Sequence, residues 1–229
     1  FRNGAYGLYT RACESVTITD CTFTHLGSSG VKHELTTTQS QQAAYWANRG
    51  QAGAERSDGG AMRIRSSSRV NIINCTVRET LRGYRIQDCS QGFVSNCRAY
   101  STLESAFYCA AGTYTGASGC THFVISNCVA QDIFHSGYLV IGGHSNTIQS
   151  CTGVNCASSA VNGWNTQDLR VLGCVFDKCN TLSFIGIGVD PGDSYGQLYM
   201  NGKEGLTDTN GYQVTCLNNS FLRCGQGAA

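Results

Sequence analysis

The chain has 229 residues, of which 16 are Lys or Arg and 15 are Asp or Glu, so its net charge is +1. This balance argues against a nucleic-acid-binding protein, for which a basic excess is expected. Charged residues make up 14% of the chain, glycine occurs 28 times and proline once, a composition that favours short strands and tight turns. No apolar run reaches about 18 residues, so we expect no membrane span.

One short motif recurs along the chain and sets the phase of the repeats. Its clearest copy ends in Asn127-Cys128, and we count the position of Cys128 as zero in every repeat. The zero positions in chain order are Cys21, Cys75, Cys97, Cys128, Cys151, Cys174 and Asn219. Apolar residues around these positions alternate with polar ones, which is the periodicity of strands with one face turned to a core.

A second apolar strand lies about ten residues after the zero position, where a small residue precedes an apolar one. Its apolar positions are Leu8, Val31, Tyr84, Phe107, Tyr138, Val161 and Phe184. The spacing from this strand to the next zero position is identical in four repeats: Leu8 to Cys21, Tyr84 to Cys97, Tyr138 to Cys151 and Val161 to Cys174. The resulting period of about 22 to 23 residues is too short for a propeller blade.

We therefore predict an all-β fold: a right-handed parallel β-helix with three short strands per rung and about seven to eight rungs. Residues 1–229 would form a single domain, which we expect to be part of a longer chain. Equivalent positions of successive rungs would stack at about 4.8 Å. Asn before the zero position suits a tight bend, because Asn tolerates left-handed backbone geometry.

The Asn-Cys pair and the apolar positions around it make the chain resemble the pectin-lyase-like superfamily of β-helices, whose second turn carries a ladder of stacked Asn side chains. The resemblance extends over nearly the whole chain and implies the fold. In that superfamily, the strand before the expanded corner lines the substrate groove. The reaction stays open, because this fold hosts several activities.

In three rungs, the segment between the second strand and the next zero position is longer than in the four regular rungs. The extra segments are residues 33–64, 110–118 and 187–211, and we predict that all three leave the helix at the same corner. Insertions on one face of a repeat protein commonly mark its binding face. The insertions and the resemblance therefore point to the same strand.

Residues next to the inward apolar position of this strand must point outward. They form one column of Tyr9, Lys32, Arg85, Tyr108, Leu139 and Asn162, and a second column of Arg11, Glu34, Gln87, Ala110, Ile141 and Trp164. Glu104 and His135 precede the strand in neighbouring rungs. Lys32 stacked on Arg85 is a like-charge contact, which is unfavourable unless an anion lies nearby.

These residue types fit a site for an acidic sugar polymer. Lys32 and Arg85 would neutralise a uronate carboxylate, and Tyr108 or His135 would transfer a proton. The candidate catalytic residues are Lys32, Arg85, Tyr108, Glu104 and His135, and the candidate substrate-binding residues are Tyr9, Arg11, Glu34, Gln87, Asn162 and Trp164. The alternative is a solvated sheet face on which Glu34 pairs with Lys32 or Arg85.

Hydrolysis would instead need two carboxylates about 5 to 10 Å apart. Glu104 with Asp132 is the nearest pair in the predicted rungs, and the third insertion offers Asp190 with Asp193. Calcium binding by the aspartates of that insertion stays open, although no further feature supports it. We predict no other cofactor.

Histidines and cysteines give no sign of a transition-metal site. The spacing of His25, His33, His122 and His144 matches no zinc motif, and they fall in different rungs. The 14 cysteines include no Cys-x-x-Cys and recur at equivalent positions of the repeat. We predict that most are free thiols stacked inside the helix, because cysteine packs as a small buried hydrophobe.

The sequence thus predicts a glycan-processing β-helix that acts on an acidic polysaccharide by lyase or depolymerase chemistry, of the kind seen in secreted enzymes and phage tailspikes. The expected setting is extracellular or on a virion, with a homotrimer as one assembly that the resemblance allows. The alternative is a non-catalytic β-helix that serves as an adhesin or as a structural or receptor-binding protein of a virion.

Overall fold

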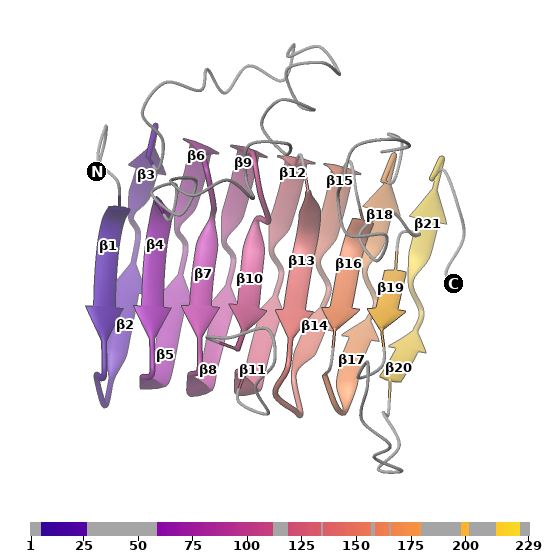
Figure 1. Ribbon diagram of the computed structural model, residues 1–229. Helices are drawn as coiled ribbons and strands as arrows, with labels where there is room; N and C mark the ends of the chain where they lie inside the picture. Colours follow the sequence, from indigo (N-terminus) through magenta and orange to yellow (C-terminus); the bar gives the residue numbers. More distant parts are fainter. Residues whose placement is uncertain are drawn as a thin grey trace, which may run out of the picture.

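The chain forms 21 strands within the residues that the computed structural model describes. These residues are 6–26, 59–111, 119–133, 135–156, 159–164, 166–179, 198–201 and 214–224, with the backbone alone for Trp164 and 198–201. The strands build three parallel seven-stranded sheets, to which each rung contributes one strand apiece (Figure 1). The predicted all-β fold, a parallel β-helix, is confirmed, with seven rungs in the described residues. None of the described residues forms a helix that could span a membrane.

The three sheets run side by side along the helix axis. The first contains β1 (Tyr6–Arg11), β4 (Gly60–Arg65), β7 (Tyr84–Gln87), β10 (Phe107–Ala110), β13 (Ser136–Ile141), β16 (Ser159–Trp164) and β19 (Leu198–Asn201). The second contains β2 (Val16–Thr19), β5 (Ser68–Ile73), β8 (Ser90–Ser95), β11 (Thr121–Ser126), β14 (Thr147–Gln149), β17 (Leu169–Leu172) and β20 (Val214–Leu217). The third contains β3 (Thr22–Thr24), β6 (Thr76–Thr80), β9 (Arg98–Thr102), β12 (Val129–Ile133), β15 (Thr152–Cys156), β18 (Val175–Asp177) and β21 (Ser220–Leu222).

The residue before each zero position forms the bend between the second and third sheets. Its backbone is left-handed in every rung, with φ between 50° and 60° at Asp20, Asn74, Asn96, Asn127, Ser150, Gly173 and Asn218. Asn127 N–H also donates to the carbonyl of Gln149 in the next rung at 3.2 Å. The predicted role of Asn at this bend is therefore confirmed, because Asn adopts left-handed geometry more readily than most residues.

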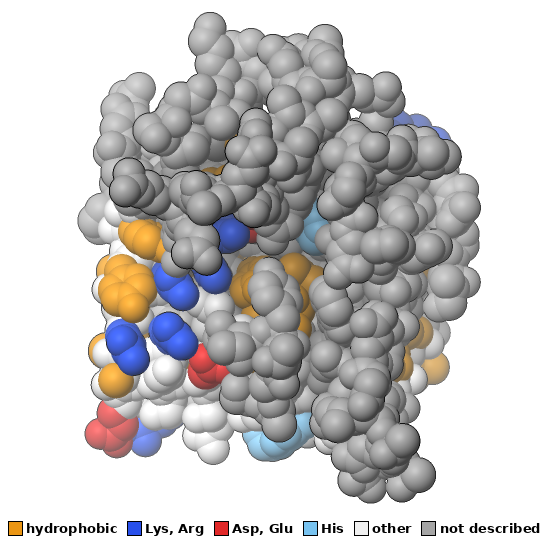
Figure 2. Space-filling model, viewed as in Figure 1, with side chains coloured by type: hydrophobic (Ala, Val, Ile, Leu, Met, Phe, Trp, Pro, Cys, Tyr) orange, Lys and Arg blue, Asp and Glu red, His pale blue; other side chains and the backbone are white. Residues whose placement is uncertain are grey.

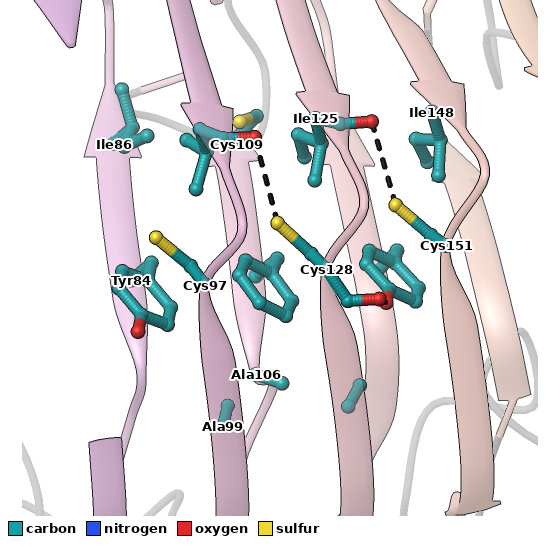
Figure 3. Packing of buried hydrophobic residues seen from close by; sticks show 14 of the residues in the cluster. Tyr84, Ile86, Cys97, Ala99, Ala106, Cys109, Ile125, Cys128, Ile148 and Cys151 are labelled. Carbon is teal, nitrogen blue, oxygen red and sulfur yellow. Dashed lines mark hydrogen bonds between the residues drawn. The ribbon is translucent and has the colours of Figure 1, made fainter. Parts of the chain in front are cut away.

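The cysteine at the zero position points into the core. The thiols of Cys97, Cys128 and Cys151 lie in one row inside the helix (Figure 3). Each lies near a carbonyl oxygen of the preceding rung, as Cys128 Sγ does to Val94 O at 3.5 Å and Cys151 Sγ to Ile125 O at 3.5 Å. All 14 cysteines are free and ten are buried, as the sequence predicted.

All three predicted insertions have different bounds in the structure, and residue 110 of the second one is the last residue of β10. Residues 60–64 belong to β4 rather than to the insertion 33–64, and residues 198–201 form β19 within 187–211. The extra residues 27–58 and 180–197 therefore precede a strand of the first sheet, whereas 112–118 and 202–213 follow one. The prediction that all insertions leave the same corner is wrong. Residues 60–64 and 198–201, which were assigned to the loops, pair with neighbouring strands of the first sheet.

The left-handed bend makes a first prediction. Asn127 is exposed and has φ 52°, so replacing it changes the backbone preference without changing the core. We expect Asn127→Ala to lower the free energy of unfolding by about 1 kcal/mol and Asn127→Gly to change it by a few tenths, because only glycine and Asn adopt this geometry at little cost. Urea unfolding measures both, and equal stability of the two variants would contradict the assigned role.

The buried thiols predict how stability changes with pH. Burial raises the pKa of Cys89 to about 12, and burial is also the main cause that raises the pKa of Cys128. An unfolded thiol loses its proton near pH 8.5, so above that pH the unfolded chain binds fewer protons than the folded chain. The free energy of unfolding should therefore fall as pH rises from about 8.5 toward 12, by up to about 1.4 kcal/mol per pH unit for each thiol whose pKa is raised in this way.

Urea titrations at several pH values under reducing conditions test this dependence. Cys89→Ser removes one ionisable group, so its slope should be shallower than that of the parent even if the variant is less stable at neutral pH. Constant stability across this alkaline range would show that the thiols ionise equally well in both states.

Candidate functional site

The outward face of the first sheet carries the predicted columns in a corrected register. One column runs through Tyr9, Arg63, Arg85, Tyr108, Leu139, Asn162 and Tyr199, and the other through Arg11, Arg65, Gln87, Ala110, Ile141, Trp164 and Asn201. The structure thus brings together most of the residues that the sequence assigned to this face.

Arg63 occupies the position between Tyr9 and Arg85 at which the sequence placed Lys32. The predicted column was wrong at this rung, because β4 is the strand that pairs with β1 and β7. Lys32 and Glu34 lie outside the described residues. The sequence did hold the correct signal: Met62 follows a small residue, and its distance from Cys75 along the chain is the one that separates the two strands in the regular rungs.

Four arginines cluster on this face, and we call Arg11, Arg63, Arg65 and Arg85 the arginine patch. Arg63 is the register neighbour of Arg85, and Arg11 is the neighbour of Arg65. Arg11 is exposed and the other three are half-buried. Figure 2 shows basic side chains gathered over the strands at the β1 end of the sheet, next to hydrophobic side chains.

Polar and aromatic neighbours hold the patch in place. Arg63 donates from Nε to Gln87 Oε1 at 2.8 Å and from Nη1 to the Tyr6 hydroxyl at 3.3 Å. Its guanidinium carbon lies 5.9 Å from the centre of the Tyr9 ring, and that of Arg85 lies 5.5 Å from the Tyr108 ring. These contacts orient the two guanidinium groups.

Carboxylates meet this surface at its margins. Asp88 lies 3.8 Å from Arg65 Nε, and Glu104 forms a two-pronged ion pair with Arg82, with Nη2 to Oε1 at 2.8 Å. Both side chains of the Arg82–Glu104 pair are largely buried. Glu104 is therefore a partner of Arg82 at the corner before β10 rather than a group on the open face.

The half of the face beyond β7 is apolar and buried. Tyr108, Ala110, Leu139 and Ile141 form one cluster on β10 and β13. Asn162 is next to Leu139 in register and is 1% exposed, and its Oδ1 has no hydrogen-bond partner among the described residues. Of Trp164 the structure describes the backbone alone. The outward face therefore changes from cationic to apolar along the helix axis.

His135 lies in a buried serine cluster at the same corner. Its Nδ1 is 3.2 Å from Ser105 Oγ and 3.1 Å from Ser136 Oγ, and Ser136 Oγ is 3.0 Å from Ser159 Oγ. His135 is 7% exposed and the three serines less. The contacts with the serines hold the buried ring in place.

The predicted carboxylate pair has other partners. Glu104 is bound by Arg82, and Asp132 accepts a hydrogen bond from Asn155 Nδ2 at 2.8 Å. Asp190, Asp193 and Asp208 lie outside the described residues. Within the described ranges, no group of three or more His, Cys, Asp or Glu residues could hold a metal ion.

Comparison with known families gives one match. A family profile described as the right-handed β-helix region matches residues 1–121, more than half of the chain. The matched part includes the whole arginine patch. No curated protein and no solved structure matches the chain, so the comparisons bear on the fold and leave the reaction to be argued from the site.

The buried ion pair predicts that Glu104 is essential for stability whatever its chemistry. Glu104→Gln leaves the Arg82 charge buried beside a neutral amide and should lower the free energy of unfolding by about 3 kcal/mol. Glu14 pairs with Arg69 on the surface, so Glu14→Gln is the control and should have little effect. If urea unfolding shows equal, small losses for both variants, the buried pair does not stabilise the fold.

Proposed function

The chain belongs to the right-handed β-helix family, and on this premise we propose that it is a glycan-processing protein whose arginine patch binds an acidic polysaccharide. Membership of the family does not by itself specify a substrate. The observation that carries the proposal is the arrangement of Arg11, Arg63, Arg65 and Arg85 in neighbouring rungs on one outward face.

The charge of the patch favours an anionic ligand. Like charges on neighbouring strands repel, and an anion bound between them relieves this repulsion. Guanidinium groups suit carboxylates in particular, because their planar N–H groups can donate two parallel hydrogen bonds. A polymer with a carboxylate on successive sugars would engage arginines of successive rungs.

Aromatic side chains beside the patch support a sugar ligand. Tyr9 is 48% exposed and lies next to Arg63 in register. A tyrosine ring offers an apolar face with a polar tip, which suits sugar rings that have both C–H and O–H groups. Gln87 orients Arg63 and adds an amide within reach of hydroxyl groups.

Lyase chemistry is the reaction that this arrangement supports best. An arginine that neutralises a uronate carboxylate makes the adjacent carbon-bound proton easier to remove. Tyr108 is next to Arg85 in register and carries a hydroxyl that can transfer a proton. The base takes the proton, a carbon–carbon double bond forms, and the glycosidic oxygen leaves. The resemblance to pectin-lyase-like β-helices supports the same assignment.

The other residues assigned from the sequence keep proposed roles. We retain Lys32, Glu104 and His135 as candidates for catalysis, and Tyr9, Arg11, Glu34, Gln87, Asn162 and Trp164 as candidates for substrate binding. Arg63 joins the binding set because of its position between Tyr9 and Arg85. An extracellular or virion setting and a homotrimer belong to the same proposal.

A second candidate function is glycan binding without cleavage, as in an adhesin or a receptor-binding protein of a virion. One observation favours it: the proton-transfer groups Tyr108 and His135 are both buried, at 8% and 7% exposure. Under this function the arginine patch would bind the same polymers, and no chemistry would follow.

Binding and cleavage assays with polygalacturonate, alginate and a neutral glucan test the proposal. Arg63→Ala and Arg85→Ala should each weaken binding to the acidic polymers about 10-fold or more, the effect of losing one hydrogen-bonded charged partner. Arg170→Ala is the matched control, because Arg170 is an exposed arginine of β17 that pairs with Asp168. Binding should also weaken as ionic strength rises.

The products distinguish the two functions. New ultraviolet absorbance from unsaturated uronate ends indicates a lyase, and reducing ends without that absorbance indicate a hydrolase. Binding with neither product indicates the non-catalytic function. Equal binding by the parent, Arg63→Ala and Arg85→Ala would remove the arginine patch from consideration.

A further inference from the structure

Two histidines from neighbouring rungs meet at another corner of the helix. His122 is in β11, and His144 lies just before β14, one rung further on. Their ring centroids are 5.1 Å apart and the ring planes make an angle of 85°. Both side chains are exposed. The two residues do fall in different rungs, as the sequence predicted, but the stacking of those rungs brings their rings together.

The backbone under the pair is firmly held. His122 N–H donates to the carbonyl of His144 at 3.2 Å. His144 forms parallel bridges to Thr121 on one side and to Gln167 on the other. The rung-to-rung hydrogen bonds therefore fix the separation of the two Cα atoms, so a ligand held by both rings would lose little free energy to ordering the backbone.

The separation of the rings suits a shared metal ion. An ion bound by one nitrogen of each ring at about 2.1 Å, with a nitrogen–metal–nitrogen angle of about 90° to 110°, holds the ring centroids about 4.6 to 5.3 Å apart. The observed 5.1 Å lies within this range. The perpendicular planes are compatible with coordination, because each ring can turn about its own metal–nitrogen bond.

A hydrogen bond supports one of the two ligands. His144 Nδ1 lies 3.3 Å from Ser145 Oγ. A histidine that donates Nδ1–H to an oxygen presents Nε2 as a lone-pair donor, and such contacts orient metal-binding imidazoles in proteins. Ser145 can therefore set the tautomer in which His144 binds an ion.

We propose that His122 and His144 form a binding site for a divalent transition-metal ion. Imidazole ligands suit Zn²⁺, Ni²⁺ and Cu²⁺, whereas Ca²⁺ and Mg²⁺ prefer oxygen ligands. Two protein ligands leave the remaining positions to water, so the ion exchanges more readily than one in a closed four-ligand site. Because the ligands come from adjacent rungs, the bound ion links one rung to the next and stabilises the folded chain.

This site is separate from the arginine patch and independent of the proposed glycan chemistry. His122 lies in β11 of the second sheet, whereas the arginines of the patch lie on β1, β4 and β7 of the first sheet. Failure of polysaccharide binding would therefore leave the metal site untouched, and failure of metal binding would leave the glycan proposal untouched.

Calorimetric titration with Ni²⁺ at pH 7.5 and at pH 5 tests the site. Accessible thiols are first alkylated, because Cys216 is exposed and Cys13, Cys21 and Cys224 are half-buried. We expect one Ni²⁺ per chain at pH 7.5 and much weaker binding at pH 5, where protons compete for the imidazoles. His122→Gln and His144→Gln should each reduce the affinity at least 10-fold. His25→Gln is the control, because His25 is exposed and pairs with Glu79 elsewhere.

A measurement on the parent chain adds a readout that does not depend on a variant. Addition of Zn²⁺ to the parent should shift the ring proton resonances of two histidines together. Spectra of the two variants assign these resonances, because each variant lacks one of the two histidines. Unchanged affinity in either His122→Gln or His144→Gln, or an absence of binding at one ion per chain, would overturn the two-histidine site.

Discussion

The stacking of each rung on the next in strict parallel register is the constraint on which the whole structure depends. The register continues through the corners as well as along the strands. At the bend between the second and third sheets, Asn96 N–H donates to Ser126 O and Asn127 N–H donates to Gln149 O. One residue beyond the zero position, Val129 N–H donates to Cys97 O at 2.9 Å. A rung therefore cannot shift by one residue without losing these bonds and turning its apolar side chains outward.

The same constraint explains the interior. Equivalent positions stack, so each column must be filled with side chains that pack on copies of themselves. Tyr84, Phe107 and Tyr138 stack with ring centroids 4.7 and 5.1 Å apart, and the hydroxyl groups of the two tyrosines donate to the carbonyls of Cys75 and Cys128. Cysteine suits the zero position because it is small and its thiol can donate weakly to a nearby carbonyl.

On the outer surface, stacking places the side chains of equivalent positions next to one another. Arginines of neighbouring rungs become a cationic surface, and His122 and His144 become a pair of possible ligands in one place. In both arrangements, side chains that can carry like charges lie one strand apart, which is unfavourable by itself. Both are held by the backbone ladder and the core, which makes them rigid places at which to receive an anion or a cation.

The sequence by itself determined the repeat, the inward columns, the free thiols and the left-handed bends. These features depend on short stretches of chain: Asn127 satisfies the backbone at the bend and Cys128 fills the core. Cys returns at the zero position of six of the seven rungs, and Asn precedes it in four. Arg85, Gln87 and Tyr9 could be placed on one face for the same reason, because their rungs have the regular spacing, and Tyr108 because its strand follows Cys97 at the usual distance.

The tertiary structure decided which residues of the long rungs form strands and which side chains of neighbouring rungs meet. Val31 and Met62 both follow a small residue, and moving a long insertion from one side of a strand to the other changes the closure entropy little. The spacing from Met62 to Cys75 is the regular one, but the choice of Met62, and with it of Arg63 in place of Lys32, becomes plain only from the hydrogen bonding of β4 to β1 and β7. The contact of His122 with His144 and the burial of His135 likewise depend on neighbouring rungs, whose packing no local pattern records.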